Sequence, residues 1–238
     1  MRSRIFPTLV ALAAFSVLIA LGVWQMERRA WKNDLIARIE AALSAPPANY
    51  NPTKPAGAEA REFMLVRVKG EFLNTQAVKV LTPTPETALM RTREGFGYLI
   101  YTPLKFNEGI VFVNRGFVPQ SLEGSQTLLA GGETEVRGIV RIPAPSGWFT
   151  PQAEPAKRLF FAADIPAMAA AAGLKSGETI VNEYIEAVPV PGAAAWPLAR
   201  DPRILLASIP NRHLEYALTW FALAAAFAGL FAISIRRT

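Results

Sequence analysis

The chain has 238 residues, of which 51% are hydrophobic and only 18% are charged, a balance that indicates a folded domain carrying a few membrane segments. The absence of cysteine excludes disulfides and thiolate metal sites, and the single histidine excludes a multi-histidine metal centre within one chain. The net charge of +6 comes largely from arginines at the two ends, and no basic stripe of the kind that binds nucleic acid is present.

The first predicted element is a transmembrane helix. Residues 9–24 (LVALAAFSVLIALGVW) carry no charge, and with residues 5–8 they reach the roughly 20 residues that span a bilayer. A cleaved signal peptide is the alternative, but the run passes into WQMERRAWK without the small-residue pattern that peptidases need. We therefore predict a cytoplasmic tail over residues 1–8 and an uncleaved transmembrane helix over residues 9–26.

Residues 27–212 are predicted to form a β-rich domain with one or two helices. Apolar residues at intervals of four indicate a helical face that ends at the proline-rich segment 44–57: Trp31, Leu35, Ile39 and Leu43. Six short segments rich in β-branched and aromatic residues then predict a mainly antiparallel barrel or sandwich: 62–72, 77–83, 97–104, 109–118, 134–142 and 179–190. A helix is expected over 165–174, capped by Asp164 and ended by Gly173.

The last element is a second transmembrane helix, over residues 213–235, followed by a tail over residues 236–238. Arginines at both ends of the chain place both termini in the cytoplasm under the positive-inside rule, although Arg28, Arg29 and Lys32 argue the other way for the first helix. Long segments translocate largely regardless of charge, so we expect the central domain to face the periplasm, or the equivalent space of an organelle.

Enzyme motifs are absent from the sequence. It contains no G-x-S-x-G elbow, P-loop or H-E-x-x-H, and no dinucleotide fingerprint follows a strand. The carboxylate pairs Glu133 with Glu135 and Glu183 with Glu186 are expected to be solvated strand positions, because acidic residues are mostly exposed. We predict that the chain is not an enzyme.

The only histidine, His213, lies where the second transmembrane helix begins. The first helix ends on the same face of the membrane, so Trp24 and Gln25 are expected at the depth of His213. Tyr216 and Trp220 follow His213 at i+3 and i+7, on one stripe of the helix. The residues alone leave two explanations open, an aromatic interface belt with a polar cap and an axial haem ligand beside an apolar stripe.

Three blocks of the sequence resemble, in the same order, the surfeit locus protein family of cytochrome c oxidase assembly factors: LGVWQMERRAWKNDLI (21–36), GYLIYTPL with FVNRGFVP (97–119) and NRHLEYALTWFALA (211–224). The resemblance implies a bacterial inner-membrane protein that binds haem a and assists its insertion into the catalytic subunit of the oxidase. It makes His213 the proposed iron ligand and places the family's Trp-Gln block on Trp24, Gln25 and Arg28. The implied partners are that subunit and membrane lipid, and the machinery that synthesises haem a is a further candidate.

Residues 114–116 (Asn-Arg-Gly) have two interpretations. They form a turn after a strand in which Arg115 pairs locally, or the Arg115 guanidinium holds a haem propionate or an acidic patch on the oxidase. Phe117 stands where the family usually has tryptophan, which keeps a large ring but removes an N–H donor. The leading hypothesis is a haem a-binding assembly factor; the alternatives are a structural chaperone that binds no haem and a membrane-tethered periplasmic enzyme.

Overall fold

The computed structural model describes residues 2–53, 57–124, 132–175, 177–190, 192, 196–201 and 211–236, and it divides the chain into two compact units. The first unit joins Met1–Arg38 to Ala207–Thr238, and the second comprises Ile39–Leu206. Part of the predicted C-terminal tail, including Arg237, lies outside the described residues, as does most of the predicted return segment before His213. Each unit is described by itself.

The first unit is a pair of long helices, α1 (Arg2–Ser44) and α6 (His213–Arg236). Both are long and apolar enough to cross a membrane, which agrees with the predicted pair of terminal apolar helices. Helix α1 does not stop at the end of the predicted span. It continues through the amphipathic stretch to Ser44, because no glycine or proline interrupts the chain between Gly22 and Pro46.

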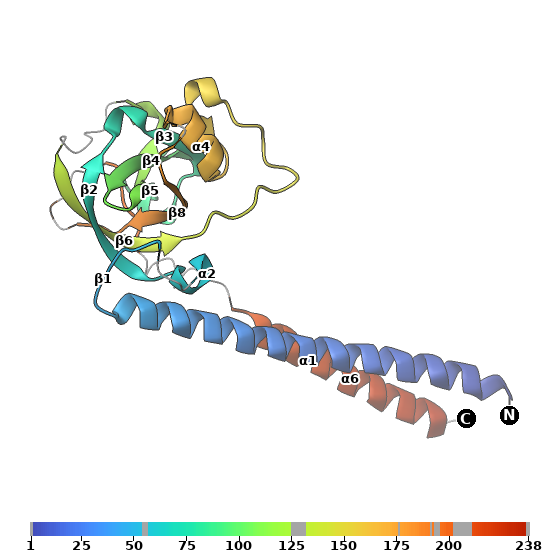
Figure 1. Ribbon diagram of the computed structural model, residues 1–238. Helices are drawn as coiled ribbons and strands as arrows, with labels where there is room; N and C mark the ends of the chain where they lie inside the picture. The colour runs from blue at the N-terminus through green and yellow to red at the C-terminus, as the bar shows by residue number, and fades with distance from the viewer. Residues whose placement is uncertain are drawn as a thin grey trace. The chain divides into compact units, whose positions relative to one another are not determined.

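Small residues let the two helices approach closely, and the helices run side by side with both termini at the same end of the pair (Figure 1). Ala217 and Ala224 are buried on α6, and Ala11 is buried on α1. A Cβ atom on Gly22 would lie only 2.4 Å from the ring of Phe221. The Phe221 ring therefore occupies the space that the missing side chain leaves, as is usual where membrane helices associate.

The second unit is built on one eight-stranded sheet in the order β1-β2-β6-β8-β5-β4-β3-β7. Strand β2 also pairs with β4, so that β2, β6, β8, β5 and β4 close into a barrel. Most pairs are antiparallel, and the pairs β1–β2, β3–β7 and β5–β8 are parallel, which confirms the predicted β-rich domain. The strands are β1 (Ala48–Asn49), β2 (Leu65–Phe72), β3 (Val78–Pro83), β4 (Phe96–Phe106), β5 (Gly109–Pro119), β6 (Glu133–Arg141), β7 (Leu159–Phe160) and β8 (Ile180–Ala187).

Short helices complete the second unit. Helix α4 (Ile165–Ala172) covers the sheet beside β3 and buries Ile165 and Met168 against it. As predicted, Asp164 caps α4 by accepting a hydrogen bond from the Ala167 N–H at 3.0 Å, and Gly173 ends it in the left-handed conformation. The remaining short elements are α2 (Ala58–Arg61), α3 (Glu86–Leu89), η1 (Asn74–Gln76), η2 (Gln120–Leu122) and η3 (Pro155–Lys157).

The expectation that Glu183 and Glu186 are solvated is wrong. Strand β8 lies between β5 and β6, so both of its edges are paired, and Glu183 is 1% exposed. Its carboxylate accepts hydrogen bonds from the Tyr50 hydroxyl at 2.7 Å and from the Arg61 Nε at 3.1 Å. Glu186 pairs with Arg141 at 3.3 Å. Burial, followed by the hydrogen bond to Glu183, raises the pKa of Tyr50.

Candidate functional site

His213 and Gln25 form a hydrogen-bonded pair between α6 and α1. His213 is the first residue of α6, and its Nδ1 lies 2.8 Å from the Gln25 Oε1. An amide oxygen only accepts hydrogen bonds, so Nδ1 carries the proton and donates it to Gln25. Nε2 then holds the free lone pair of the neutral ring, and no hydrogen-bond partner for it is found among the described residues.

A second polar pair lies beyond the first along α1. The Asn211 side-chain amide donates to the Asn33 Oδ1 at 2.7 Å. Gln25 and Asn33 are eight residues apart, which puts them on one side of α1. The two pairs hold the chain that enters α6 against α1 and so fix where His213 starts the helix.

The predicted aromatic stripe divides between two faces of α6. Ala217 is buried toward α1 and Trp220 is half-buried, whereas Tyr216 is 53% exposed. Trp24, next to Gln25 on α1, is also 53% exposed. The rings of Trp24 and Tyr216 are therefore free to contact a further apolar molecule, while Ala217 belongs to the helix contact.

Arg28 lies one turn of α1 beyond Gln25. Its guanidinium is 4.0 Å from the centroid of the Trp31 ring, a cation–π contact that orients the side chain along the helix. Within the described part of the chain, Arg28 has no carboxylate partner. An exposed guanidinium held in this way can bind a carboxylate from another molecule.

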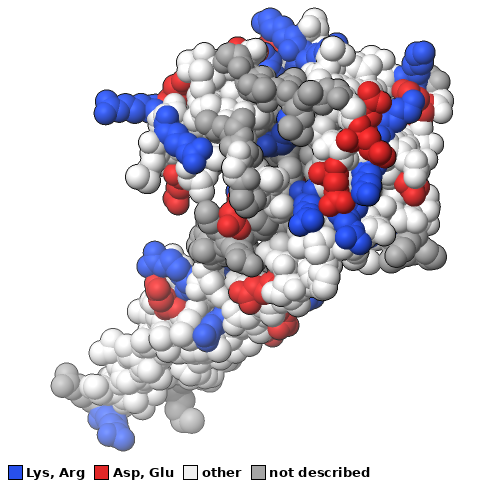
Figure 2. All heavy atoms as spheres, turned by 90° about the vertical axis from the view of Figure 1, so that its left-hand side faces the viewer, with Lys and Arg blue, Asp and Glu red and all other residues white. Residues whose placement is uncertain are grey.

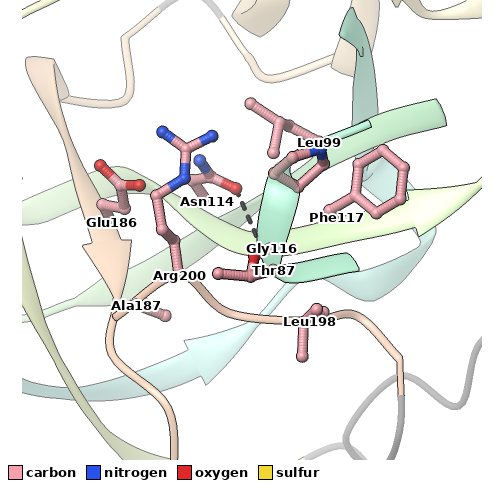
Figure 3. Close-up of a pocket in the computed structure, with 10 residues that line it drawn as sticks. Thr87, Leu99, Asn114, Gly116, Phe117, Glu186, Ala187, Leu198 and Arg200 are labelled. Carbon is pink, nitrogen blue, oxygen red and sulfur yellow. Dashed lines mark hydrogen bonds between the residues drawn. The ribbon is translucent and has the colours of Figure 1, made fainter. Parts of the chain in front are cut away.

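Arg115 belongs to the second unit, and the prediction that residues 114–116 form a turn is wrong. They lie inside strand β5, at a bulge where the register shifts between the pairs Leu99↔Phe117 and Tyr101↔Asn114. The Asn114 side-chain oxygen accepts the Gly116 N–H at 3.0 Å, as Figure 3 shows. A glycine is required because its φ is +118° and because a Cβ would lie 2.3 Å from the Leu198 backbone.

The Arg115 guanidinium is used inside the domain. It donates to the Asn74 Oδ1 at 3.3 Å and lies 4.9 Å from the centroid of the Phe72 ring, and the residue is only 9% exposed. Burial lowers the pKa of Arg115 from its usual value. These partners favour local pairing, and the contact with a haem propionate stays a prediction.

Two hollows formed by described residues of the second unit do not resemble a haem site. The pocket beside the bulge, with Glu186 and Arg200 at its rim in Figure 3, has a volume of about 10 Å³ and holds no more than a water molecule. A larger hollow of about 480 Å³ opens beside β2. It is lined by the charged residues Arg67, Lys69, Glu108 and Glu135, and none of its lining residues is a histidine.

The structure thus brings Gln25 to His213, leaves Trp24 and Tyr216 exposed nearby along the helices, and places Arg115 in a separate unit. The contact between Asn33 and Asn211 was missed from the sequence. The only signal for it in the sequence was that Gln25 and Asn33 are eight residues apart, a spacing that puts two polar side chains on one side of a helix.

Comparison with known proteins shows what the chain is similar to. The SURF1 family model matches residues 12–225. Surfeit locus protein 1 of Xenopus tropicalis is 32% identical over 231 residues, covering 92% of this chain and 71% of the relative. The human Surfeit locus protein 1 is 31% identical over 219 residues, covering 87% and 70%. A SURF1-like protein of Monosiga brevicollis is 31% identical over 220 residues, covering 88% and 80%.

Proposed function

The chain belongs to the SURF1 family, and from this premise we propose that it is a non-enzymatic assembly factor of cytochrome c oxidase that binds haem a through His213. The observation that carries the proposal is the hydrogen bond from His213 to Gln25, which leaves Nε2 as the free nitrogen. The bound haem a would then be passed to the catalytic subunit of the oxidase. That subunit is the proposed main partner, and the machinery that makes haem a is a further candidate.

The residues around His213 fit a haem. Within the described ranges, no group of three or more His, Asp or Glu side chains could hold a bare metal ion, so a metal bound here has to bring most of its ligands with it. A haem would do so, because its porphyrin supplies most of the ligands of the iron and the protein would supply a further one. The imidazole of His213 would be a suitable donor, because it would use Nε2 while Nδ1 stays bonded to Gln25.

Gln25 orients the ligand. Metal-binding histidines usually donate their second ring N–H to an oxygen, which fixes the tautomer and the ring plane and raises the basicity of the ligating nitrogen. The 2.8 Å contact between Nδ1 and the Gln25 Oε1 has this form. Gln25 is therefore a positioning residue that acts through His213.

Trp24, Tyr216 and Arg28 would bind the rest of the haem. The exposed rings of Trp24 and Tyr216 offer apolar surface for the macrocycle, and Trp220 adds a half-buried ring on α6. Arg28 offers a guanidinium for a propionate. Haem a supplies the redox-active iron, and this chain binds it, orients it and shields part of it from water.

The proposed location is the bacterial inner membrane, crossed twice, with both termini in the cytoplasm and the central domain in the periplasm. Figure 2 supports the membrane assignment, because the middle of the helix pair carries no charged side chains on the face shown while both of its ends do. Both termini lie at one end of this pair, as two crossings require. In the sequence, Arg2 and Arg4 stand at the start of α1 and Arg236 stands at the end of α6. Under the positive-inside rule these arginines favour a cytoplasmic location for both termini.

A structural chaperone that binds no haem is the second candidate. The hydrogen bond between His213 and Gln25 would equally hold together the polar ends of two membrane helices. The second unit also presents interspersed positive and negative side chains on the face shown in Figure 2, which suits contact with another protein. In this case the chain would hold the immature catalytic subunit through its helices and its domain.

Purification from cells that make haem a separates the two candidates. We expect the wild-type protein to carry haem a in stoichiometric amount, and His213→Ala to lose it while remaining in the membrane. Thr219→Ala, six residues further along α6, is the matched control and should keep the haem. A wild-type protein without haem would leave the structural chaperone, and haem retained by His213→Ala would move the ligand to another residue.

A further inference from the structure

The loop between β6 and η3 carries two aromatic side chains in full contact with solvent. Trp148 and Phe149 are completely exposed, and the loop (yellow in Figure 1) stands away from the barrel. Large exposed apolar side chains that lie together on a folded domain mark a contact with another molecule. The binding of haem proposed above does not use this loop.

The tip of the loop is an ordered turn. The Thr150 N–H donates to the Gly147 carbonyl at 3.0 Å, and the Gly147 N–H donates to the Thr150 Oγ1 at 2.9 Å. These bonds form a β-turn with Trp148 and Phe149 at its two central positions. The turn holds both rings outward and at the same time satisfies two of its own backbone N–H groups and one carbonyl.

The composition of the loop suits a lipid interface. Residues 142–153 (IPAPSGWFTPQA) contain no charged side chain, although Arg141 and Glu154 flank them directly. Three prolines restrict the backbone, so little further conformational entropy is lost when the tip is fixed. Entry of a segment into the interface is costly when it carries charges or unpaired backbone groups, and this tip has neither a charge nor a free Thr150 or Gly147 N–H.

We propose that the Trp148–Phe149 turn inserts into the interfacial layer of the membrane and is a third membrane contact of the chain. Tryptophan favours this layer because its ring is apolar and its N–H reaches the hydrated headgroups. The domain is tied to the bilayer at both ends, so the turn meets lipid at a high effective concentration and two side chains are enough for binding. The bound partner is the lipid headgroup and upper acyl-chain region, and anionic lipid is not required because the loop carries no charge.

The inference rests on the membrane anchoring proposed for α1 and α6 and is independent of haem. The test uses the full chain in lipid nanodiscs that hold a single copy. Because the sequence has no cysteine, Ser146→Cys gives one site for a spin label beside the turn with both aromatic residues kept. Collision with oxygen reports lipid around the label, and collision with a water-soluble nickel chelate reports water.

We expect the label at residue 146 to collide with oxygen and to be protected from nickel. Trp148→Ser with Phe149→Ser should remove that protection. Leu89→Ser with Met90→Ser is the matched control, since these side chains are also exposed and apolar but lie at α3, and it should keep the protection. A label open to nickel in the unsubstituted background, or one shielded from both reagents as in a contact with protein, would overturn the proposal.

A reference label at Leu230→Cys, on the exposed side of α6, tests the membrane anchoring of the helices separately from the membrane contact of the loop. Oxygen contact at residue 230 together with nickel contact at residue 146 would leave the anchoring intact and refute the loop contact alone. Nickel contact at residue 230 would refute both.

Discussion

Breaking the buried ion pair between Arg61 and Glu183 should strongly destabilise the β domain. Glu183 is 1% exposed and Arg61 is 13% exposed, and the carboxylate also accepts the Tyr50 hydroxyl. Removing one partner of such a pair leaves a buried charge uncompensated, which costs about 3–5 kcal/mol. For a domain of this size we expect Glu183→Leu to lower the Tm by about 6–20 °C.

The double variant Glu183→Leu with Arg61→Met should be more stable than Glu183→Leu alone, because it also removes the buried Arg61 charge that Glu183 no longer compensates. Both variants, Arg61→Met and the wild type are compared by thermal unfolding of the full chain in detergent, followed by near-UV circular dichroism. If the losses of the two single variants simply add in the double variant, the two side chains do not interact in the folded protein and the reasoning is refuted.

Four further outcomes are expected. The free energy of unfolding should fall as pH rises through about 10, because the raised pKa of Tyr50 makes the folded state keep a proton that the unfolded state loses. Tyr50→Phe should make this fall smaller in urea titrations between pH 8 and 11. Gln25→Leu should weaken haem a binding by about 10–100-fold in spectral titrations, whereas unchanged affinity would remove Gln25 from the site. Arg28→Ala should weaken haem a binding in the same titrations more than Arg29→Ala does, and equal effects would argue against a propionate contact at Arg28. Gly22→Leu should move α1 away from α6 at a cost of about 1–3 kcal/mol, and spin-label distances between the helices report this separation. Phe221→Ala should partly restore the short distance in the Gly22→Leu background, and a double variant as separated as Gly22→Leu alone would contradict the close contact of Gly22 with Phe221.

The β segments could be predicted from the sequence because local signals define them. Each of the six predicted segments is short, rich in β-branched and aromatic residues, and bounded by Gly, Pro or Asn, and each overlaps one of the observed strands. Helix α4 carried its own cap and stop signals at Asp164 and Gly173. The order of the strands cannot be predicted from local patterns. The pairing of β2 with β4, which closes the barrel, joins residues that are far apart in the chain.

The errors have the same origin. Glu183 is buried because β8 is a central strand, which the sequence of β8 does not reveal. Residues 114–116 have the composition of a turn, but the partner strand continues past them and turns them into a bulge within β5. Helix α1 was predicted in two parts because its membrane half is uniformly apolar and its second half amphipathic. The helix continues from one part into the other because no glycine or proline interrupts residues 23–45.

The candidate site was partly accessible from the sequence. Topology placed Gln25 at the level of His213, and the structure joins the two side chains by a hydrogen bond. The choice of Nε2 as the free nitrogen required the structure, because it depends on which atom of Gln25 faces the ring. The structure was also needed to show that Tyr216 is exposed and Ala217 is buried, because the packing of α6 on α1 decides which face of α6 is covered.

The central claim is that Nε2 of His213 binds the iron of haem a. It is tested most directly by titrating haem a into haem-free protein in nanodiscs and recording the spectrum of the wild type, of His213→Ala, and of His213→Ala with added imidazole. We predict a histidine-ligated spectrum in the wild type, its loss in His213→Ala, and its return when imidazole fills the vacated position. An unchanged spectrum in His213→Ala would contradict the claim.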